Sequence, residues 1–263
     1  MFSLTVLGNN GPFPAKNGAC SGYLLRHDDT KIIMDLGSGA LANLTSVISS
    51  DMDDIDAIIL THLHADHISD VAVLRYALFR NNALDRDGNA LKIPLYCPPA
   101  PRPEYDVLCS YTQFDVRPVT EDLVLNINNL SLAFAPMQHP YPVYAISAVT
   151  AGDAFSRKFI YTGDTSWTQD LIQFAEGADL MLADANLISQ DRLTGKPVFH
   201  LTAEECGIAA AEAGVGRLIL THFTPGSDIG RRIAEARAGA QKVLGRSDGI
   251  LVEDAQILTS YEI

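Results

Sequence analysis

The segment from His62 to His67 holds the densest group of metal-binding side chains in the sequence, His-Leu-His-Ala-Asp-His. Three imidazoles and one carboxylate are the ligand types that suit zinc and other borderline cations. In an extended or turning backbone His62 and His64 point to the same side, and Asp66 and His67 reach the same space from the next turn. A His-rich surface loop is the alternative, but the apolar run before His62 argues against it. The segment therefore predicts a metal site.

Three more ligand-type side chains, His139, Asp164 and His222, each follow an apolar run that is expected to be a strand. Taken singly, each has an ordinary structural explanation. A histidine at such a place is more often a hydrogen-bonded structural residue, and Asp164 could cap a helix beginning near Trp167. Their coincidence with the His62–His67 segment favours one shared metal site.

The remaining histidines differ from each other in context. His27, in Arg26-His27-Asp28-Asp29, is expected to be an ordinary exposed turn residue. His200 lies just before Thr202, which is a candidate N-cap with Glu205 as its capping-box partner. A cap at Thr202 would also fix the turn that aims His200, so a structural and a functional role are compatible.

Short apolar runs ending at polar residues predict strands, and longer amphipathic stretches predict helices. The expected strands are 3–7, 22–26, 31–35, 57–61, 92–97, 123–127, 130–137, 143–150, 158–162, 180–185, 217–221, 249–252 and 255–259, and the expected helices are 68–79, 168–176, 203–213 and 229–244. Gly177 and Gly214 follow two of these helices, where a left-handed cap favours glycine.

An internal similarity links the two halves of the chain. Ile58-Ile59-Leu60-Thr61-His62 resembles Leu218-Ile219-Leu220-Thr221-His222, an apolar strand that ends in Thr-His. Chance could produce four matching residues, but two similar half-domains would also explain them. We expect residues 1–263 to form a single metallo-hydrolase domain made of two such halves.

Composition narrows the class of protein further. The 263 residues are 47% apolar and carry a formal net charge of −13, which disfavours binding to an extended nucleic-acid backbone. No apolar run is long enough for a membrane span, and the first residues lack the features of a signal peptide. The four cysteines show neither zinc-knuckle nor disulfide spacing, so a cytoplasmic location is expected.

The order His-x-His-x-Asp-His, then His139, Asp164 and His222, resembles the metallo-β-lactamase fold superfamily over nearly the whole chain. The resemblance implies an α/β fold, a four-layer αββα sandwich of two mixed β-sheets flanked by helices. It assigns His62, His64 and His139 to one metal and Asp66, His67 and His222 to a second, with Asp164 bridging both. The expected cofactors are two divalent ions, with zinc preferred and manganese or iron as alternatives.

Three features resemble the ribonuclease Z-like, phosphodiesterase-like branch. Asp66-His67 supplies two ligands to the second metal, the segments 11–17 and 34–39 resemble that branch's opening, and His200-Leu201-Thr202 resembles its HxT motif. In that branch the histidine faces the scissile phosphate and a glutamate orients it. Asp184 stands in the glutamate's place and is shorter by one methylene, so a longer or water-mediated contact with His200 is expected.

The resemblance therefore implies a phosphodiesterase that works through a metal-bridging hydroxide, with Asp66, His200 and Asp184 as catalytic residues. Only 25 positions separate His139 from Asp164, which leaves no room for the long arm with which ribonuclease Z grips transfer RNA. A small or short phosphodiester is the expected substrate. The alternatives are a lactone or thioester hydrolase on the same metals, and a non-catalytic metal-binding or nucleic-acid-associated scaffold. Family habit and exposed sheet edges suggest a homodimer.

Overall fold

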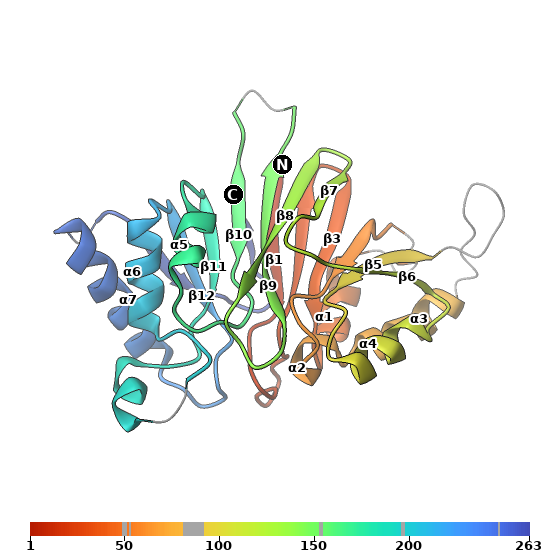
Figure 1. Ribbon diagram of the computed structural model, residues 1–263, viewed down its shortest axis with the longest axis horizontal. Helices are drawn as coiled ribbons and strands as arrows, with labels where there is room; N and C mark the ends of the chain where they lie inside the picture. Colours follow the sequence, from red (N-terminus) through yellow and green to blue (C-terminus); the bar gives the residue numbers. More distant parts are fainter. Residues whose placement is uncertain (49–51, 53, 81–91, 153–154, 196–197, 247) are drawn as a thin grey trace. The chain divides into compact units, whose positions relative to one another are not determined.

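The computed structural model describes residues 1–48, 52, 54–80, 92–152, 155–195, 198–246 and 248–263 (Figure 1). The chain divides into two compact units, residues 1–120 with 256–262 and residues 121–255 with 263. Each unit is built around one seven-stranded mixed sheet. The predicted pair of mixed sheets flanked by helices is therefore confirmed.

The sheet of the first unit runs in the order β14-β1-β2-β3-β4-β5-β6. Strands β14, β1, β2 and β3 pair antiparallel, and β3, β4, β5 and β6 pair parallel. The strands are β1 (Phe2–Gly8), β2 (Gly22–His27), β3 (Thr30–Leu36), β4 (Ala57–Ile59), β5 (Ile93–Cys97), β6 (Phe114–Pro118) and β14 (Ser260–Glu262), and the helices are α1 (Ala40–Val47), α2 (Ala65–Ile68), α3 (Val71–Arg80) and α4 (Arg102–Cys109).

The sheet of the second unit runs in the order β13-β12-β11-β10-β9-β8-β7. Strands β7, β8, β9 and β10 pair antiparallel, and β10, β11, β12 and β13 pair parallel. The strands are β7 (Val124–Ile127), β8 (Leu130–Met137), β9 (Val143–Thr150), β10 (Lys158–Tyr161), β11 (Leu180–Asp184), β12 (Arg217–Thr221) and β13 (Leu251–Asp254), and the helices are α5 (Gln169–Ala175), α6 (Ala203–Glu212) and α7 (Ile229–Leu244), with a 3-10 turn over Ser189–Thr194.

The ligand-type residues predicted from the sequence lie where strands end. In a run of parallel strands all carboxyl ends meet at one edge of the sheet, which is where α/β proteins place their sites. In the first unit β4 leads into His62. In the second unit β10 leads to Asp164, β11 ends in Asp184 and β12 leads to His222. The topology thus gathers one set of polar side chains at one edge of each sheet.

The two sheets share a pattern, in which an antiparallel half is followed by a parallel half. The Thr-His segments that resemble each other occupy different places in it. β4 is the second strand of its parallel run, whereas β12 is the third of its own. An origin from two similar half-domains within a single domain stays a prediction.

Several expectations about individual elements are wrong. Residues 255–259 form a turn with Leu258 at φ 63°, and the last strand is Ser260–Glu262. The helix expected from Ile68 begins earlier and is split into α2 and α3. His27 is 3% exposed at the end of β2, where its ring packs edge-on against Phe2, so it is not an exposed turn residue.

Two helices of the second unit end just before the glycines that were expected to follow them. Gly177 and Gly214 both adopt φ 67°, a left-handed conformation that costs glycine little.

Among the described residues, no helix has the length and apolar character needed to cross a bilayer.

Candidate metal centre

The first unit places the His62–His67 segment between the end of β4 and the first turn of α2. His62 and His67 are fully buried, and the Asp66 side chain is 11% exposed. The ring centroids of His62 and His67 lie 4.1 Å apart, and Nε2 of His67 lies 3.7 Å from Oδ2 of Asp66. The predicted ligands of this segment are therefore brought together within the unit.

Asp35, at the end of β3, organises this segment although it was not predicted as a site residue. Its Oδ1 accepts the backbone N–H of Thr61 at 2.8 Å, and its Oδ2 accepts the Thr61 hydroxyl at 2.9 Å. The same Oδ2 lies 2.7 Å from Nδ1 of His67. Because a carboxylate only accepts, the His67 proton belongs on Nδ1, so in the neutral ring the lone pair is on Nε2, the form that can ligate a metal through this atom.

Gly37 lets the loop after β3 approach the backbone of the ligand segment. A Cβ at this position would lie 1.9 Å from the carbonyl oxygen of Asp66 and 2.7 Å from Cβ of Cys20. Only glycine fits so close to another backbone. The contact fixes the turn that presents Asp66.

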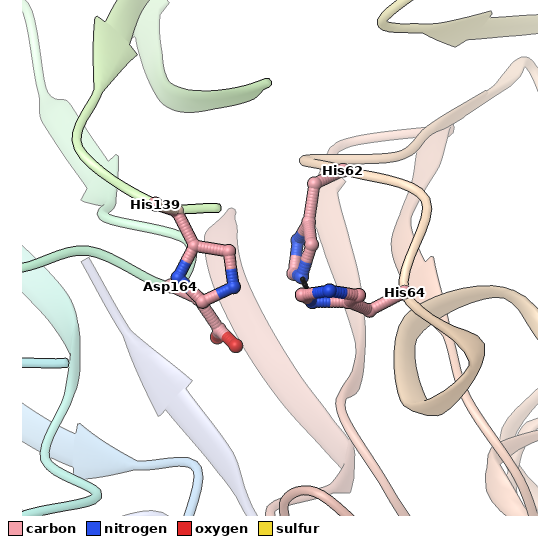
Figure 2. A group of neighbouring side chains, drawn as sticks. All are labelled: His62, His64, His139 and Asp164. Carbon is pink, nitrogen blue, oxygen red and sulfur yellow. Dashed lines mark hydrogen bonds between the residues drawn. The ribbon is translucent and has the colours of Figure 1, made fainter. Parts of the chain in front are cut away.

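His62 and His64 bring two ring nitrogens close together in the first unit (Figure 2). Nε2 of His62 and Nδ1 of His64 are 2.9 Å apart and share a hydrogen bond, drawn as the dashed line. Two imidazole nitrogens directed at one point are the arrangement with which proteins bind zinc. The donor types therefore fit a divalent metal.

The second unit presents His139 after β8 and Asp164 after β10 (Figure 2). Nδ1 of His139 donates to the carbonyl oxygen of Phe199 at 3.0 Å, so in the neutral ring the lone pair is on Nε2. Burial lowers the pKa of His139 despite the nearby Asp164 carboxylate. A neutral imidazole is the form that binds a metal.

Four side chains of the second unit form a compact cluster. One ligand atom from each of Asp164, Asp184, His200 and His222 lies within 4.8 Å of the others. Nε2 of His222 is 3.3 Å from Oδ2 of Asp164, and the His200 and His222 rings stack with centroids 5.2 Å apart. The predicted ligands Asp164 and His222 are thus neighbours of the predicted catalytic pair His200 and Asp184.

The expected long or water-mediated contact between His200 and Asp184 is wrong. Nδ1 of His200 donates directly to Oδ2 of Asp184 at 2.8 Å. Burial disfavours charge on both groups, but their mutual attraction outweighs it, so the pKa of Asp184 is lowered and the pKa of His200 is raised. The shorter aspartate reaches because His200 is held close to it by the turn before α6.

That turn is fixed by the predicted capping box. The Thr202 hydroxyl accepts the backbone N–H of Glu205 at 3.2 Å, and the Glu205 carboxylate accepts the backbone N–H of Thr202 at 2.9 Å. The N-cap prediction for Thr202 is confirmed. Asp164, in contrast, caps no helix, since α5 begins at Gln169 with Thr168 as its N-cap.

Two further residues, which were not predicted, hold the backbone around His222. His222 has φ 60°, a strained value for a residue with a side chain. Nδ2 of Asn186 donates to the His222 carbonyl at 3.0 Å. Arg232 of α7 in turn donates from Nε to the Ala185 carbonyl at 3.0 Å and from Nη2 to the Asn186 carbonyl at 2.6 Å. Nothing in the sequence marks these tertiary contacts beforehand.

The sequence and the fold are both similar to those of known proteins. The family model described as "Beta-lactamase superfamily domain" matches residues 8–223. The chain belongs to the metallo-β-lactamase fold superfamily. "Probable metallo-hydrolase YhfI" of Bacillus subtilis is 32% identical over 220 residues, which cover 84% of this chain and 86% of the relative.

The other comparisons agree with this membership of the superfamily. A crystal structure of the metallo-β-lactamase fold protein YhfI has a TM-score of 0.82 and 29% identity, with complete coverage of both chains. A "Ribonuclease Z" of Ignicoccus hospitalis is 24% identical over 281 residues, covering 88% of this chain and 91% of the relative. The resemblance to the ribonuclease Z-like branch is confirmed. The chain is a metallo-hydrolase of this superfamily, with histidine and aspartate donors suited to divalent metal ions.

Proposed function

We propose that the chain is a dinuclear metal-dependent phosphodiesterase that acts on a small or short phosphodiester. The observation that carries this proposal is the direct 2.8 Å bond between His200 and Asp184, beside Asp164 and His222. A histidine that is oriented by a carboxylate, and that belongs to neither proposed ligand set, is available to act on a substrate oxygen.

The proposed ligand sets follow the superfamily pattern. His62, His64 and His139 would hold one metal, Asp66, His67 and His222 would hold the other, and Asp164 would contact both. All seven positions fall inside the matched residues 8–223. In support, the hydrogen bonds of His67 and His139 place the ring proton on Nδ1, so in each neutral ring the lone pair is on Nε2, the tautomer that can ligate through this atom. Zinc is the preferred metal, with manganese and iron as alternatives.

When bound, two divalent cations would activate water as a nucleophile and neutralise charge on a phosphate. The protein's own residues would orient the attacking water and protonate the departing oxygen. Asp66 would accept a hydrogen bond from the attacking water. The raised pKa of His200 favours its charged form, which can donate a proton to the departing oxygen, while Asp184 holds the ring by its other nitrogen.

Two observations favour a small substrate over a transfer RNA. Only 25 positions separate His139 from Asp164, and β9 and β10 occupy much of the described part of that stretch, which leaves too few residues for a long arm. The net charge of −13 opposes contact with many phosphates of one nucleic acid. The ribonuclease Z relative supports phosphodiester chemistry, since a ribonuclease cleaves that bond. The four cysteines are present as thiols, which suits a reducing compartment, and we infer a cytoplasmic location.

The test measures hydrolysis of bis-p-nitrophenyl phosphate before chelation, after chelation and after zinc or manganese is returned. We expect turnover that is lost with the metal and restored by it. A parallel panel of lactones and thioesters separates this proposal from the other hydrolase activities that share the fold. Turnover of a lactone or thioester, without turnover of the phosphodiester, would overturn the proposal. Inertness toward every ester would favour a non-catalytic scaffold.

The His200→Ala variant tests the role of this histidine. We expect turnover of bis-p-nitrophenyl phosphate to fall by about 100-fold or more, as for loss of a general acid, while the metal content measured by elemental analysis stays near that of the wild type. A variant that loses metal as well as activity would show that His200 is a ligand.

A further inference from the structure

A cavity of about 540 Å³ lies in the second unit beside the residues that hold His222. Its lining includes Asn186, Thr224, Ser227, Arg231 and Arg232. The volume is in the range of small-molecule sites. Asn186 belongs both to this lining and to the hydrogen bond with the His222 carbonyl, so the cavity borders a proposed metal ligand.

Arg232 is a buried cation at the wall of this cavity. The residue is 6% exposed, and its Nε and Nη2 are used by the carbonyls of Ala185 and Asn186. These acceptors are neutral, and no ion pair joins Arg232 to a carboxylate of the described residues. Nη1 takes part in neither bond. Since buried charges in proteins are normally paired, the arrangement favours an anion in the cavity.

Arg231 adds a second guanidinium to the lining. Its Nε contacts Oε1 of Glu235 at 3.0 Å, and its side chain is 44% exposed. The pair with Glu235 steadies the side chain, and at this exposure it contributes little to stability. Arginine guanidinium groups bind phosphate oxygens through parallel N–H bonds, which single ammonium groups cannot do.

Two acidic residues also line the cavity, but each has an oxygen engaged by backbone. Oδ2 of Asp191 accepts the N–H of Ile188 at 2.9 Å, and Oδ1 of Asp228 accepts the N–H of Arg231 at 2.9 Å. Asp228 is thereby the N-cap of α7, and Asp191 closes the start of the 3-10 turn over Ser189–Thr194. They offset part of the positive charge without forming an ion pair with Arg232.

We propose that the cavity beside Arg231 and Arg232 binds a second phosphate group of the substrate, one that is not hydrolysed. This inference rests on the proposed phosphodiesterase function and adds a substrate class to it, namely small phosphodiesters that carry a further phosphate. The hydroxyls of Thr224 and Ser227, which line the same cavity, can donate to the same group.

The test compares equilibrium binding of thymidine 3′,5′-bisphosphate and thymidine 5′-monophosphate to the zinc-loaded enzyme by calorimetry. A metal centre can take one phosphate of either compound, so the difference isolates the second phosphate. We expect the bisphosphate to bind at least about 10-fold more tightly, the effect of one charge-assisted hydrogen bond. Arg231→Gln should reduce that ratio toward one. Arg237→Gln, on the exposed side of the same helix, removes the same charge and should keep the ratio.

A ratio near one in the wild type, or a ratio that Arg231→Gln and Arg237→Gln lower equally, would overturn the inference. The outcome is independent of turnover. A bisphosphate preference that depends on Arg231, in a protein that does not hydrolyse bis-p-nitrophenyl phosphate, would keep the anion site and remove the phosphodiesterase. Hydrolysis of bis-p-nitrophenyl phosphate by a protein that shows no bisphosphate preference would keep the phosphodiesterase function and remove the anion site.

Discussion

The two oxygens of the Asp184 carboxylate hold two different histidines. Oδ2 accepts Nδ1–H of His200 at 2.8 Å, and Oδ1 lies 3.4 Å from Nδ1 of His222. One residue therefore sets both the charge of the proposed acid and the orientation of a proposed ligand. Carboxylates behind metal-binding histidines commonly raise metal affinity in this way.

The Asp184→Asn variant tests whether the carboxylate of Asp184 keeps His200 charged. The wild-type carboxylate raises the pKa of His200, so activity that needs the charged ring is present at low pH and is lost as the pH rises through that raised pKa. The neutral amide removes the attraction, so the loss of activity should move to lower pH. Profiles of kcat against pH measure the shift. Asp170→Asn, exposed in the first turn of α5, is the control, and an unmoved alkaline limb in Asp184→Asn would contradict the assignment.

Asp35→Ala tests the carboxylate that organises the first unit. It removes the acceptor for the Thr61 hydroxyl and backbone N–H and for His67, all of which are buried. We expect the free energy of unfolding to fall by about 3 kcal/mol and metal affinity to fall by about 10- to 100-fold. Denaturation and competition with a metal indicator measure the two effects. Asp54→Ala, at an exposed carboxylate that pairs with Lys31, should change both little, and equal effects from the two variants would refute the role of Asp35.

The roles of supporting residues such as Asp35 could not be predicted from the sequence, whereas the ligand segment could. His62, His64, Asp66 and His67 are recognisable because four ligand types fall within six positions. Asp35 is one of 32 acidic residues, and its partners lie 26 and 32 positions away. Its role depends on tertiary contacts that no local pattern encodes, and the same holds for Asn186 and Arg232.

At the scale of elements, the close contact of α6 and α7 fixes the helix layer of the second unit. A Cβ on Gly207 would lie 1.9 Å from the carbonyl oxygen of Ala236, and a Cβ on Gly239 would lie 2.2 Å from that of Glu204. The two helices approach because each has glycine at the crossing. This contact supports α7, from which Arg232 reaches the carbonyls near the site.

Gly239→Ala should therefore push the helices apart. We expect a loss of about 1–3 kcal/mol in stability from overpacking against backbone. Gly230→Ala, in the first turn of the same helix, meets only Oδ1 of Asp228 at 3.4 Å. It should be neutral or stabilise by up to about 1 kcal/mol, since alanine favours helix. Thermal unfolding of both variants gives the comparison, and equal midpoints would contradict the packing account.

The elements themselves were largely predictable, with instructive exceptions. Buried strands such as β8 and β9 were predicted at their observed bounds, because apolar runs bounded by turns define them. The last strand was placed too early because residues 255–259 look apolar, yet Leu258 with φ 63° and the bond from the Gln256 N–H to the Tyr261 hydroxyl make them a turn. β6, α1 and α4 were missed. α4 is amphipathic, but it begins inside the proline-rich segment 98–103, where a helix is not expected.

At the scale of the whole molecule, the proposed ligands come from both units, so metal binding should couple to folding. A metal present at about 1,000 times its dissociation constant stabilises the folded state by about 4 kcal/mol, which corresponds to a rise in the unfolding midpoint of roughly 10 °C for a chain of this size. Chelation should lower the midpoint by this amount, and zinc should restore it. His62→Ala and His222→Ala should each weaken the response, whereas an undiminished response in both would contradict shared ligation.

The most direct measurement is a crystal structure of the zinc-loaded protein with anomalous scattering at the zinc edge. We expect two anomalous peaks, one with His62, His64 and His139 as ligands and one with Asp66, His67 and His222, and with Asp164 contacting both. A single peak, or peaks that these seven side chains do not ligate, would contradict it.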